Sequence, residues 1–260
     1  MSSGSATKHW LAAPEAALNR RCAPMTVFCR NDDAGWNNAR LFALLDVFQK
    51  HRVPIDLAVI PAALDAELAT ELVRRGASDR ELLGLHQHGY RHINHEAQGR
   101  KCEFGASRSR AEQYADLAAG RSRLREMLGE ASLDSIFTPP WNRCTQVTVD
   151  CLAELGLRSL SLDATAAALD MQGLSALPVH VDWCKAKGSL AEKRAARSHW
   201  LSAAFASAAT VGLMLHHAVM DEEDLSEVEQ LLQLLARHGE TRCRLMSQLI
   251  GHPVPAAFSV

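Results

Sequence analysis

Four of the twelve histidines in the chain lie within ten consecutive residues, at His86, His88, His92 and His95. Neutral imidazole is the commonest protein ligand for zinc-like metals, and histidines four positions apart meet on one side of a helical turn. Two histidines with one carboxylate leave a coordination position open, as hydrolytic metal sites require. His88 and His92 are therefore candidate metal ligands; the competing interpretation is a group of surface histidines on a loop.

A carboxylate for such a site is available at Asp32 and Asp33, which follow a short apolar run. Successive side chains of an extended chain alternate between two sides, so one carboxylate can bind a cation while its neighbour meets a substrate. A turn that leads into a helix capped by an aspartate would explain the same pair without any chemistry.

A stiff loop and two later motifs also carry polar groups. Pro139 and Pro140 restrict the backbone before Trp141, so this loop can direct a backbone N–H into a site as an oxyanion donor, or simply end a strand. Asp182 lies on the same strand face as His180, two residues before it. Either residue could support a metal ligand, or the two could simply be neighbours on an edge strand. His216 and its neighbour end an apolar strand, and one of the two imidazoles could protonate a leaving group.

Two kinds of apolar segment alternate along the chain and must position these residues. Runs with the length of buried strands occupy Met25–Arg30, Ile55–Pro61, Glu81–His86, Ser135–Thr138, Arg158–Leu162, Ala176–Val181 and Val211–Leu215. Apolar residues at helical spacing occupy Asn37–Arg52, Leu64–Arg75, Ala111–Leu128, Val147–Leu155, Ala191–Ala208 and Leu225–Arg237. Strands too apolar to face water, alternating with helices, predict an α/β fold with a parallel sheet. Between an open doubly wound sheet and a barrel, about seven strands favour a distorted (β/α) barrel. Most of the polar motifs then fall at the carboxyl ends of strands, where active sites of such folds lie.

Composition bounds the remaining possibilities. The 260 residues are 47% hydrophobic, which is ample for one core, and we expect a lead-in over residues 1–24 and a single domain over 25–260. The net charge of -2, without a basic stripe, argues against nucleic-acid binding. No run approaches the roughly 18 apolar residues of a membrane span, and the N-terminus lacks a signal-peptide core. Seven scattered cysteines fit free thiols, so a cytoplasmic protein is expected.

In chain order, these motifs resemble those of the polysaccharide deacetylase family, also called the NodB-homology family or carbohydrate esterase family 4. The matching segments are Asp32-Asp33, His88–His92, Pro139-Pro140-Trp141, Asp182-Trp183 and Met214-Leu215-His216. They span roughly residues 25–220, and the surrounding loops are similar to a bacterial branch other than the secreted chitin and peptidoglycan enzymes. The resemblance implies a distorted barrel, one divalent metal that is usually zinc, and hydrolysis of N-acetyl groups on amino sugars.

The resemblance also implies residue roles. It assigns the metal ligands to Asp33, His88 and His92. It assigns the general base to Asp32, the general acid to His216, and the oxyanion donor to the backbone N–H of Trp141.

This chain departs from the family at Thr138, because the third motif of the family usually opens with an arginine that supports the catalytic aspartate. Either Arg30 or Arg143 replaces it, or the catalytic aspartate is less well positioned than in the family. His217 beside His216 leaves the identity of the acid open by one residue.

The expected function is a metal-dependent N-deacetylase acting on a saccharide, glycolipid or nucleotide-sugar that contains an amino sugar. One alternative is a non-catalytic member that binds a saccharide or a metal, which the departure at Thr138 supports. Another is a different metal-dependent amidohydrolase, suggested by the pair His86 and His88. Amidohydrolases typically carry this pair on the first barrel strand, however, and here it follows the third. A metallo-β-lactamase-like site would need an aspartate where Arg91 stands.

Overall fold

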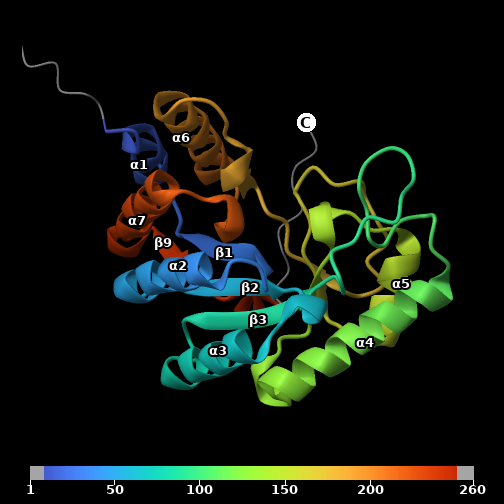
Figure 1. Ribbon diagram of the computed structural model, residues 1–260. Helices are drawn as coiled ribbons and strands as arrows, with labels where there is room; N and C mark the ends of the chain where they lie inside the picture. Colours follow the sequence, from blue (N-terminus) through green and yellow to red (C-terminus); the bar gives the residue numbers. More distant parts are fainter. Residues whose placement is uncertain (1–8, 251–260) are drawn as a thin grey trace, which may run out of the picture.

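One curled sheet of parallel strands organises the chain, and the computed structural model describes residues 9–250 (Figure 1). Along the sheet the strand order is β6-β5-β4-β3-β2-β1-β8-β7, and β9 pairs with the start of β1. The strands are β1 (Met25–Ala34), β2 (Ile55–Val59), β3 (Leu83–His88), β4 (Ile136–Thr138), β5 (Ser159–Leu160), β6 (Ser175–Ala176), β7 (Val181–Asp182), β8 (Thr210–Leu215) and β9 (Thr241–Cys243). The predicted parallel α/β architecture is confirmed.

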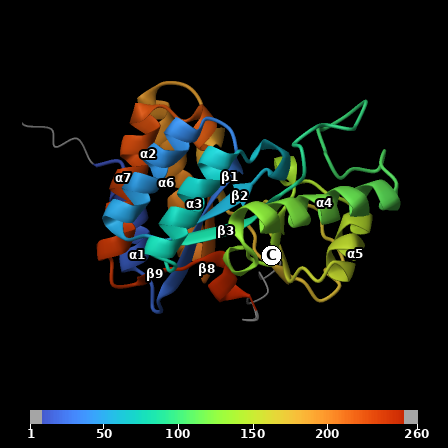
Figure 2. The same cartoon turned by 60° about the horizontal axis from the view of Figure 1, so that its bottom comes forward.

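Helices cover the outside of the sheet, with α1, α6 and α7 gathered at one end and α4 and α5 at the other (Figures 1 and 2). They are α1 (Ala12–Asn19), α2 (Asn38–His51), α3 (Ala66–Ser78), α4 (Arg110–Leu128), α5 (Gln146–Glu154), α6 (Leu190–Ser207) and α7 (Glu222–Arg237). The helical stripes read from the sequence are buried, for example Leu41, Leu44 and Phe48 on α2. Between residues 9 and 250, no helix is both long enough and apolar enough to cross a membrane. The cysteines are free thiols, as expected.

The segment predicted as one strand over Ala176–Val181 is instead two short strands at opposite ends of the sheet, so that prediction was wrong. Leu177 N–H donates to Leu160 O on the β5 side at 3.0 Å, and His180 N–H donates to Gly212 O on β8 at 2.8 Å. Pro178 lies between them and has no N–H for a ladder, which lets the chain leave one edge and join the other. A Cβ on Gly212 would lie 2.6 Å from Pro178 O, so this close crossing requires a glycine. The crossing draws the two sheet ends together as a distorted barrel.

Three other differences from the sequence analysis concern short or extended elements. Helix α1 lies within the lead-in, where Trp10 contacts Trp183 edge-on with ring centroids 5.9 Å apart. Strand β9 has three residues and no apolar run, so periodicity could not reveal it. Strand β1 continues four residues beyond the predicted end, to Ala34, and its register with β2 shifts between Asn31 and Ala34. The paired aspartates therefore belong to the end of the strand, in a bulge that aims their side chains.

Candidate active site

Asp33, His88 and His92 bring one potential ligand atom each to within 4.8 Å of one another. Asp33 Oδ1 lies 3.3 Å from His88 Nε2 and 3.2 Å from His92 Nε2. Asp33 comes from the end of β1, His88 from the end of β3, and His92 from the loop that follows β3. The three side chains predicted as metal ligands thus meet at the carboxyl edge of the sheet.

The backbone that carries these residues is unusual. Asp33 and His92 adopt positive φ angles of 65° and 58°, which non-glycine residues rarely do. The residues between His88 and His92 form a loop, so the expected helical turn was wrong although the two imidazoles still meet. Glu103 is buried beneath this loop, and its carboxylate accepts hydrogen bonds from the N–H of Arg91 at 2.7 Å and of His92 at 3.0 Å. Glu103 therefore holds the loop in the conformation that aims His92.

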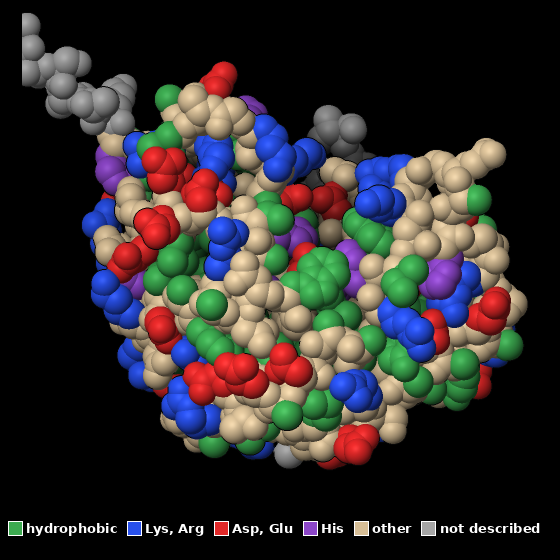
Figure 3. All heavy atoms as spheres, viewed as in Figure 1, with side chains coloured by type: hydrophobic (Ala, Val, Ile, Leu, Met, Phe, Trp, Pro, Cys, Tyr) green, Lys and Arg blue, Asp and Glu red, His purple; other side chains and the backbone are tan. Residues whose placement is uncertain are grey.

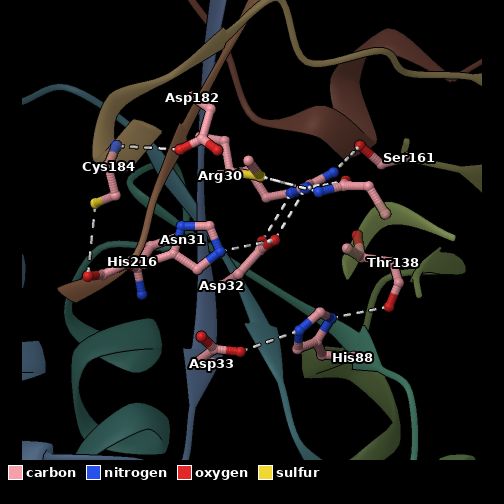
Figure 4. A network of polar contacts seen from close by, with 12 residues as sticks. Arg30, Asn31, Asp32, Asp33, His88, Thr138, Ser161, Asp182, Cys184 and His216 are labelled. Carbon is pink, nitrogen blue, oxygen red and sulfur yellow. Dashed lines mark hydrogen bonds and ion pairs between the residues drawn. The ribbon is translucent and has the colours of Figure 1, made fainter. Parts of the chain in front are cut away.

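The three residues fit a divalent metal. Asp33 Oδ1 is buried without a hydrogen-bond partner, although two imidazole nitrogens lie close to it. His88 Nδ1 donates a hydrogen bond to Thr138 O at 2.9 Å, which directs Nε2 toward Asp33 and makes Nε2 the nitrogen available to a metal (Figure 4). Burial raises the pKa of Asp33, but the two imidazoles outweigh it and lower the pKa, so the carboxylate is ionised. Two imidazoles and one carboxylate match the donors of hydrolytic zinc-like sites.

Asp32 points away from this triad and is paired with Arg30 (Figure 4). Arg30 Nε donates to Asp32 Oδ1 at 2.8 Å and Nη2 to Oδ2 at 2.9 Å, a two-point contact between fully buried side chains. The guanidinium also donates to Ser161 Oγ and to Asn142 Oδ1, both at 2.6 Å. Burial raises the pKa of Asp32, yet Arg30 together with nearby imidazoles holds it below its usual value.

Of the two arginines expected to compensate for Thr138, the structure brings only Arg30 to Asp32. Arg143 instead donates to Lys101 O at 2.9 Å, outside the barrel. Arg30 and Asp32 are two residues apart on one strand, so their side chains share a face, and this spacing is a signal that the sequence analysis could have used. Asn142 and Ser161 were missed, because nothing in their local sequence indicates a contact with Arg30.

His216 and His217 have different surroundings. His216 Nε2 lies 3.9 Å from Asp32 Oδ2, the side chain is 24% exposed, and its Nδ1 has no hydrogen-bond partner among the described residues. His217 is buried, with Nε2 2.5 Å from Trp36 O and Nδ1 2.9 Å from Asn31 Nδ2. Burial also lowers the pKa of His217. His216 is therefore the imidazole that faces the candidate base, and His217 fixes the loop.

Asp182 and Trp141 border the same centre. Asp182 Oδ1 accepts a hydrogen bond from Cys184 N–H at 3.1 Å, and burial raises its pKa against the opposing charge of His216. The Trp141 ring lies 4.5 Å from the ring of His92, centroid to centroid. Within residues 9–250, the Trp141 N–H donates no hydrogen bond, whereas the two N–H groups that follow it do.

His86 is not part of the candidate metal site. Its Nε2 lies 2.9 Å from Thr138 Oγ1 inside the barrel. Burial, reinforced by the charge of Arg30, lowers the pKa of His86 to about 3, so the ring is neutral. The His86-x-His88 pair therefore does not form the two-histidine ligand set of an amidohydrolase.

The sequence matches no protein-family model and no curated protein. Solved structures share its fold. A protein from Mycobacterium smegmatis assigned as a polysaccharide deacetylase has 16% identity and a TM-score of 0.66, over 88% of this chain and 90% of that one. A family 4 acetyl xylan esterase from Clostridium thermocellum, in complex with a cobalt ion, has 14% identity and a TM-score of 0.58, over 86% and 89%.

A third structure with this fold is a pseudoenzyme of carbohydrate esterase family 4 from Bacillus anthracis. It has 13% identity and a TM-score of 0.58, over 85% of this chain and 63% of that one. The chain thus has the NodB-like fold of carbohydrate esterase family 4, as its motifs predicted. At these sequence identities the structural similarity establishes the fold alone, and activity must be argued from the site itself.

Proposed function

We propose that this protein is a metal-dependent hydrolase that removes the N-acetyl group from an amino sugar in a saccharide, glycolipid or nucleotide-sugar. The observation that carries the proposal is the convergence of two distinct carboxylates: Asp33 faces His88 and His92, while Asp32 is held by Arg30 within 3.9 Å of His216. A ligand set beside an ionised carboxylate and an imidazole is the equipment for hydrolysis of an amide.

Asp33, His88 and His92 would hold the metal, which when bound supplies Lewis acidity to an acetamide carbonyl and to water. Asp32 is ionised and fixed in orientation by Arg30, so it can accept the proton of the attacking water. The N–H of Trp141 is available to the oxyanion that develops on the carbonyl. His216 can donate a proton to the departing nitrogen, which leaves acetate and a free amino sugar.

The non-catalytic alternative rests on the missing arginine at Thr138, and the pairing of Arg30 with Asp32 removes that ground. A complete set of metal ligands, base and acid favours turnover. The pseudoenzyme with this fold nonetheless makes catalysis a matter for direct measurement.

The test is metal content together with acetate release. Purified protein should contain about one zinc-like ion per chain and release acetate from N-acetylated glucosamine oligomers. A chelator should abolish the release, and added zinc or cobalt should restore it. O-acetylated xylan belongs in the same assay, because release from xylan alone would reassign the enzyme as an esterase. N-acetylglucosamine 1-phosphate and N-acetylmuramic acid are assayed as charged substrates, and a full metal load with no acetate from any of these compounds would establish the non-catalytic alternative.

A further inference from the structure

A cavity of about 740 Å³ borders the candidate active site and shares Trp141, Asn142 and Asp182 with it. Its walls come from the loop after β3, from the segment after β4, and from the loop after β5. Cavities of this size enclose ligands far larger than an acetamido group. The rest of a substrate whose acetyl group lies beside Asp32 would therefore occupy this cavity.

The cavity is lined by cations that lack carboxylate partners. Arg100, Arg143 and Lys185 line it, and Lys101 adjoins it, with Nζ 6.0 Å from the centre of the Trp141 ring. Across residues 9–250, no carboxylate forms an ion pair with any of these four side chains. Burial lowers the pKa of Arg143, and the like charge of Arg100 adds to this effect. The two guanidinium groups thus line one cavity without a neutralising carboxylate among residues 9–250.

The carboxylates of the cavity are engaged by their own loops instead. Glu96 Oε1 accepts hydrogen bonds from the N–H and the hydroxyl of Ser107, at 3.1 and 3.0 Å. Asp163 Oδ1 accepts from the N–H and the hydroxyl of Thr165, at 2.8 and 2.6 Å. Asp182 accepts from a backbone N–H, and burial raises its pKa. The anions thus organise the walls. Arg143 uses one N–H for Lys101 O, and its remaining donors, like those of Arg100, have no carboxylate partner among residues 9–250.

We infer that this cavity binds an anionic group, a phosphate or a carboxylate, carried by the acetamido-sugar substrate. The inference rests on the proposed function, which places the acetyl group beside Asp32. Arg100 and Arg143 are its main ligands, because guanidinium groups bind both kinds of oxyanion with two donors at once. Figure 3 shows Lys and Arg side chains at the rim of the hollow in which His and carboxylate side chains are visible. The substrate is thereby a charged saccharide or sugar phosphate, and neutral chitin-like chains fit less well.

The test is binding, measured by isothermal titration calorimetry on the full-length protein as purified. The probes are N-acetylglucosamine, N-acetylglucosamine 1-phosphate, N-acetylmuramic acid and inorganic phosphate. Either charged sugar should bind at least tenfold more tightly than N-acetylglucosamine, as expected for charge-assisted hydrogen bonds. Comparison of the two charged sugars distinguishes phosphate from carboxylate. The titrations are repeated after metal removal, so that phosphate bound at Asp33, His88 and His92 is not counted.

Variants connect the binding to the cavity. The double variant Arg100→Gln with Arg143→Gln should weaken the charged sugars at least tenfold and leave N-acetylglucosamine unchanged. Arg100 is exposed and its side chain forms no ion pair within residues 9–250, so Arg100→Gln alone should weaken them by a smaller factor and guards against misfolding of the double variant. The matched control is Arg20→Gln, an exposed arginine at the end of α1. Arg20→Gln should bind like the wild type.

Equal binding of charged and neutral sugars overturns the inference, as does charge-dependent binding that the arginine variants leave intact. Binding of inorganic phosphate without an advantage for the sugar phosphate also overturns it, because the site would then be unrelated to the substrate. Failure of the proposed function looks different. In that case no acetate is released, while charge-dependent sugar binding is still lost in the double arginine variant.

Discussion

Buried or half-buried aspartates lie at both ends of this barrel, and their pKa values are shifted in opposite directions. At the carboxyl ends of the strands, Asp32 and Asp33 have lowered pKa values. At the amino ends, Asp56 at the start of β2 has a strongly raised pKa, and Asp134 before β4 has one raised to about 6. Asp32 and Asp56 are almost equally buried, at 2% and 0% exposure. Burial therefore does not distinguish the two ends.

Their partners do. Arg30 donates two hydrogen bonds to Asp32, and imidazoles flank Asp33. Asp56 receives one backbone hydrogen bond, from Met246 N–H at 2.9 Å, and its other oxygen has no partner among the described residues. Of these four aspartates, the two with charged partners are those at the end where loops converge, which is where chemistry is expected in parallel α/β folds. Five changes can break or sharpen this contrast.

Loss of the two histidines should have the largest effect. The double variant His88→Ala with His92→Ala leaves Asp33 as the single ligand, and one carboxylate does not hold a divalent metal tightly in water. Stoichiometric metal should be lost in elemental analysis, and with it all turnover. His95→Ala, an exposed histidine of the same loop, is the control and should keep its metal. Unchanged metal content in the double variant would refute the ligand assignment.

Asp32→Asn should separate the two carboxylates of the strand end. Asn cannot accept a proton from water, so turnover should fall on the order of 10²-fold or more, as for loss of a general base. Metal content should stay at the wild-type level, because Asp33 is untouched. Comparable turnover in a metal-loaded Asp32→Asn protein would show that the base lies elsewhere.

His216→Ala and His217→Ala test which imidazole serves the site. Removal of a general acid costs about 10²–10⁴-fold in rate, so His216→Ala should lower turnover in this range and remove the alkaline limb of the pH–rate profile. His217→Ala should be milder in rate and should lower stability, because it leaves Asn31 without its partner. A reversed ranking of the two turnover losses would transfer the acid role to His217.

Arg30→Met tests the partner that lowers the pKa of Asp32. It leaves a buried carboxylate without a counter-charge, which costs about 3–5 kcal/mol in the free energy of unfolding. Combination with Asp32→Asn should restore part of this loss, because the unpaired charge is then absent. Urea unfolding of both variants measures the difference. If the double variant is no more stable than Arg30→Met, the pair is not what stabilises this end of the barrel.

The sequence predicts the parallel strands and their helices better than the segment that brings the two sheet edges together. Alternating apolar periods identify the parallel strands, since burial on both faces leaves a clear pattern. They fail at Ala176–Val181, where one short, mostly apolar segment pairs with two sheet edges and only the position of Pro178 indicates the break. They also fail at α1 and β9, which are too short for a period to register.

The residues of the candidate active site also differ in how well the sequence predicts them. Asp33, His88 and His92 could be named from residue type and order, because ligand chemistry restricts those positions. The contact of Arg30 with Ser161 and Asn142 could not, since it joins three segments that are distant in the chain. The choice of His216 over His217 also needed the structure, because it depends on which ring lies beside Trp36.

The smallest expected effect belongs to the amino end. The folded state raises the pKa of Asp56 and Asp134 above the ordinary value of about 3.9, so both bind protons more tightly when folded. Their contribution to stability is full below about pH 4 and is lost as the pH rises, for Asp134 through about 6. Asp56→Asn keeps an acceptor for Met246 N–H without the buried charge. It should therefore stabilise the protein by about 1 kcal/mol or more at pH 8, where loss of a buried unpaired charge is favourable, and by less at pH 5.

Urea unfolding at pH 5 and at pH 8 measures this difference in the free energy of unfolding. The control is the exposed Asp46→Asn, whose effect should be the same at both pH values. A loss of stability in Asp56→Asn that is equal at both pH values would mean that Asp56 is a charged partner within the core, and the contrast between the two ends would fail.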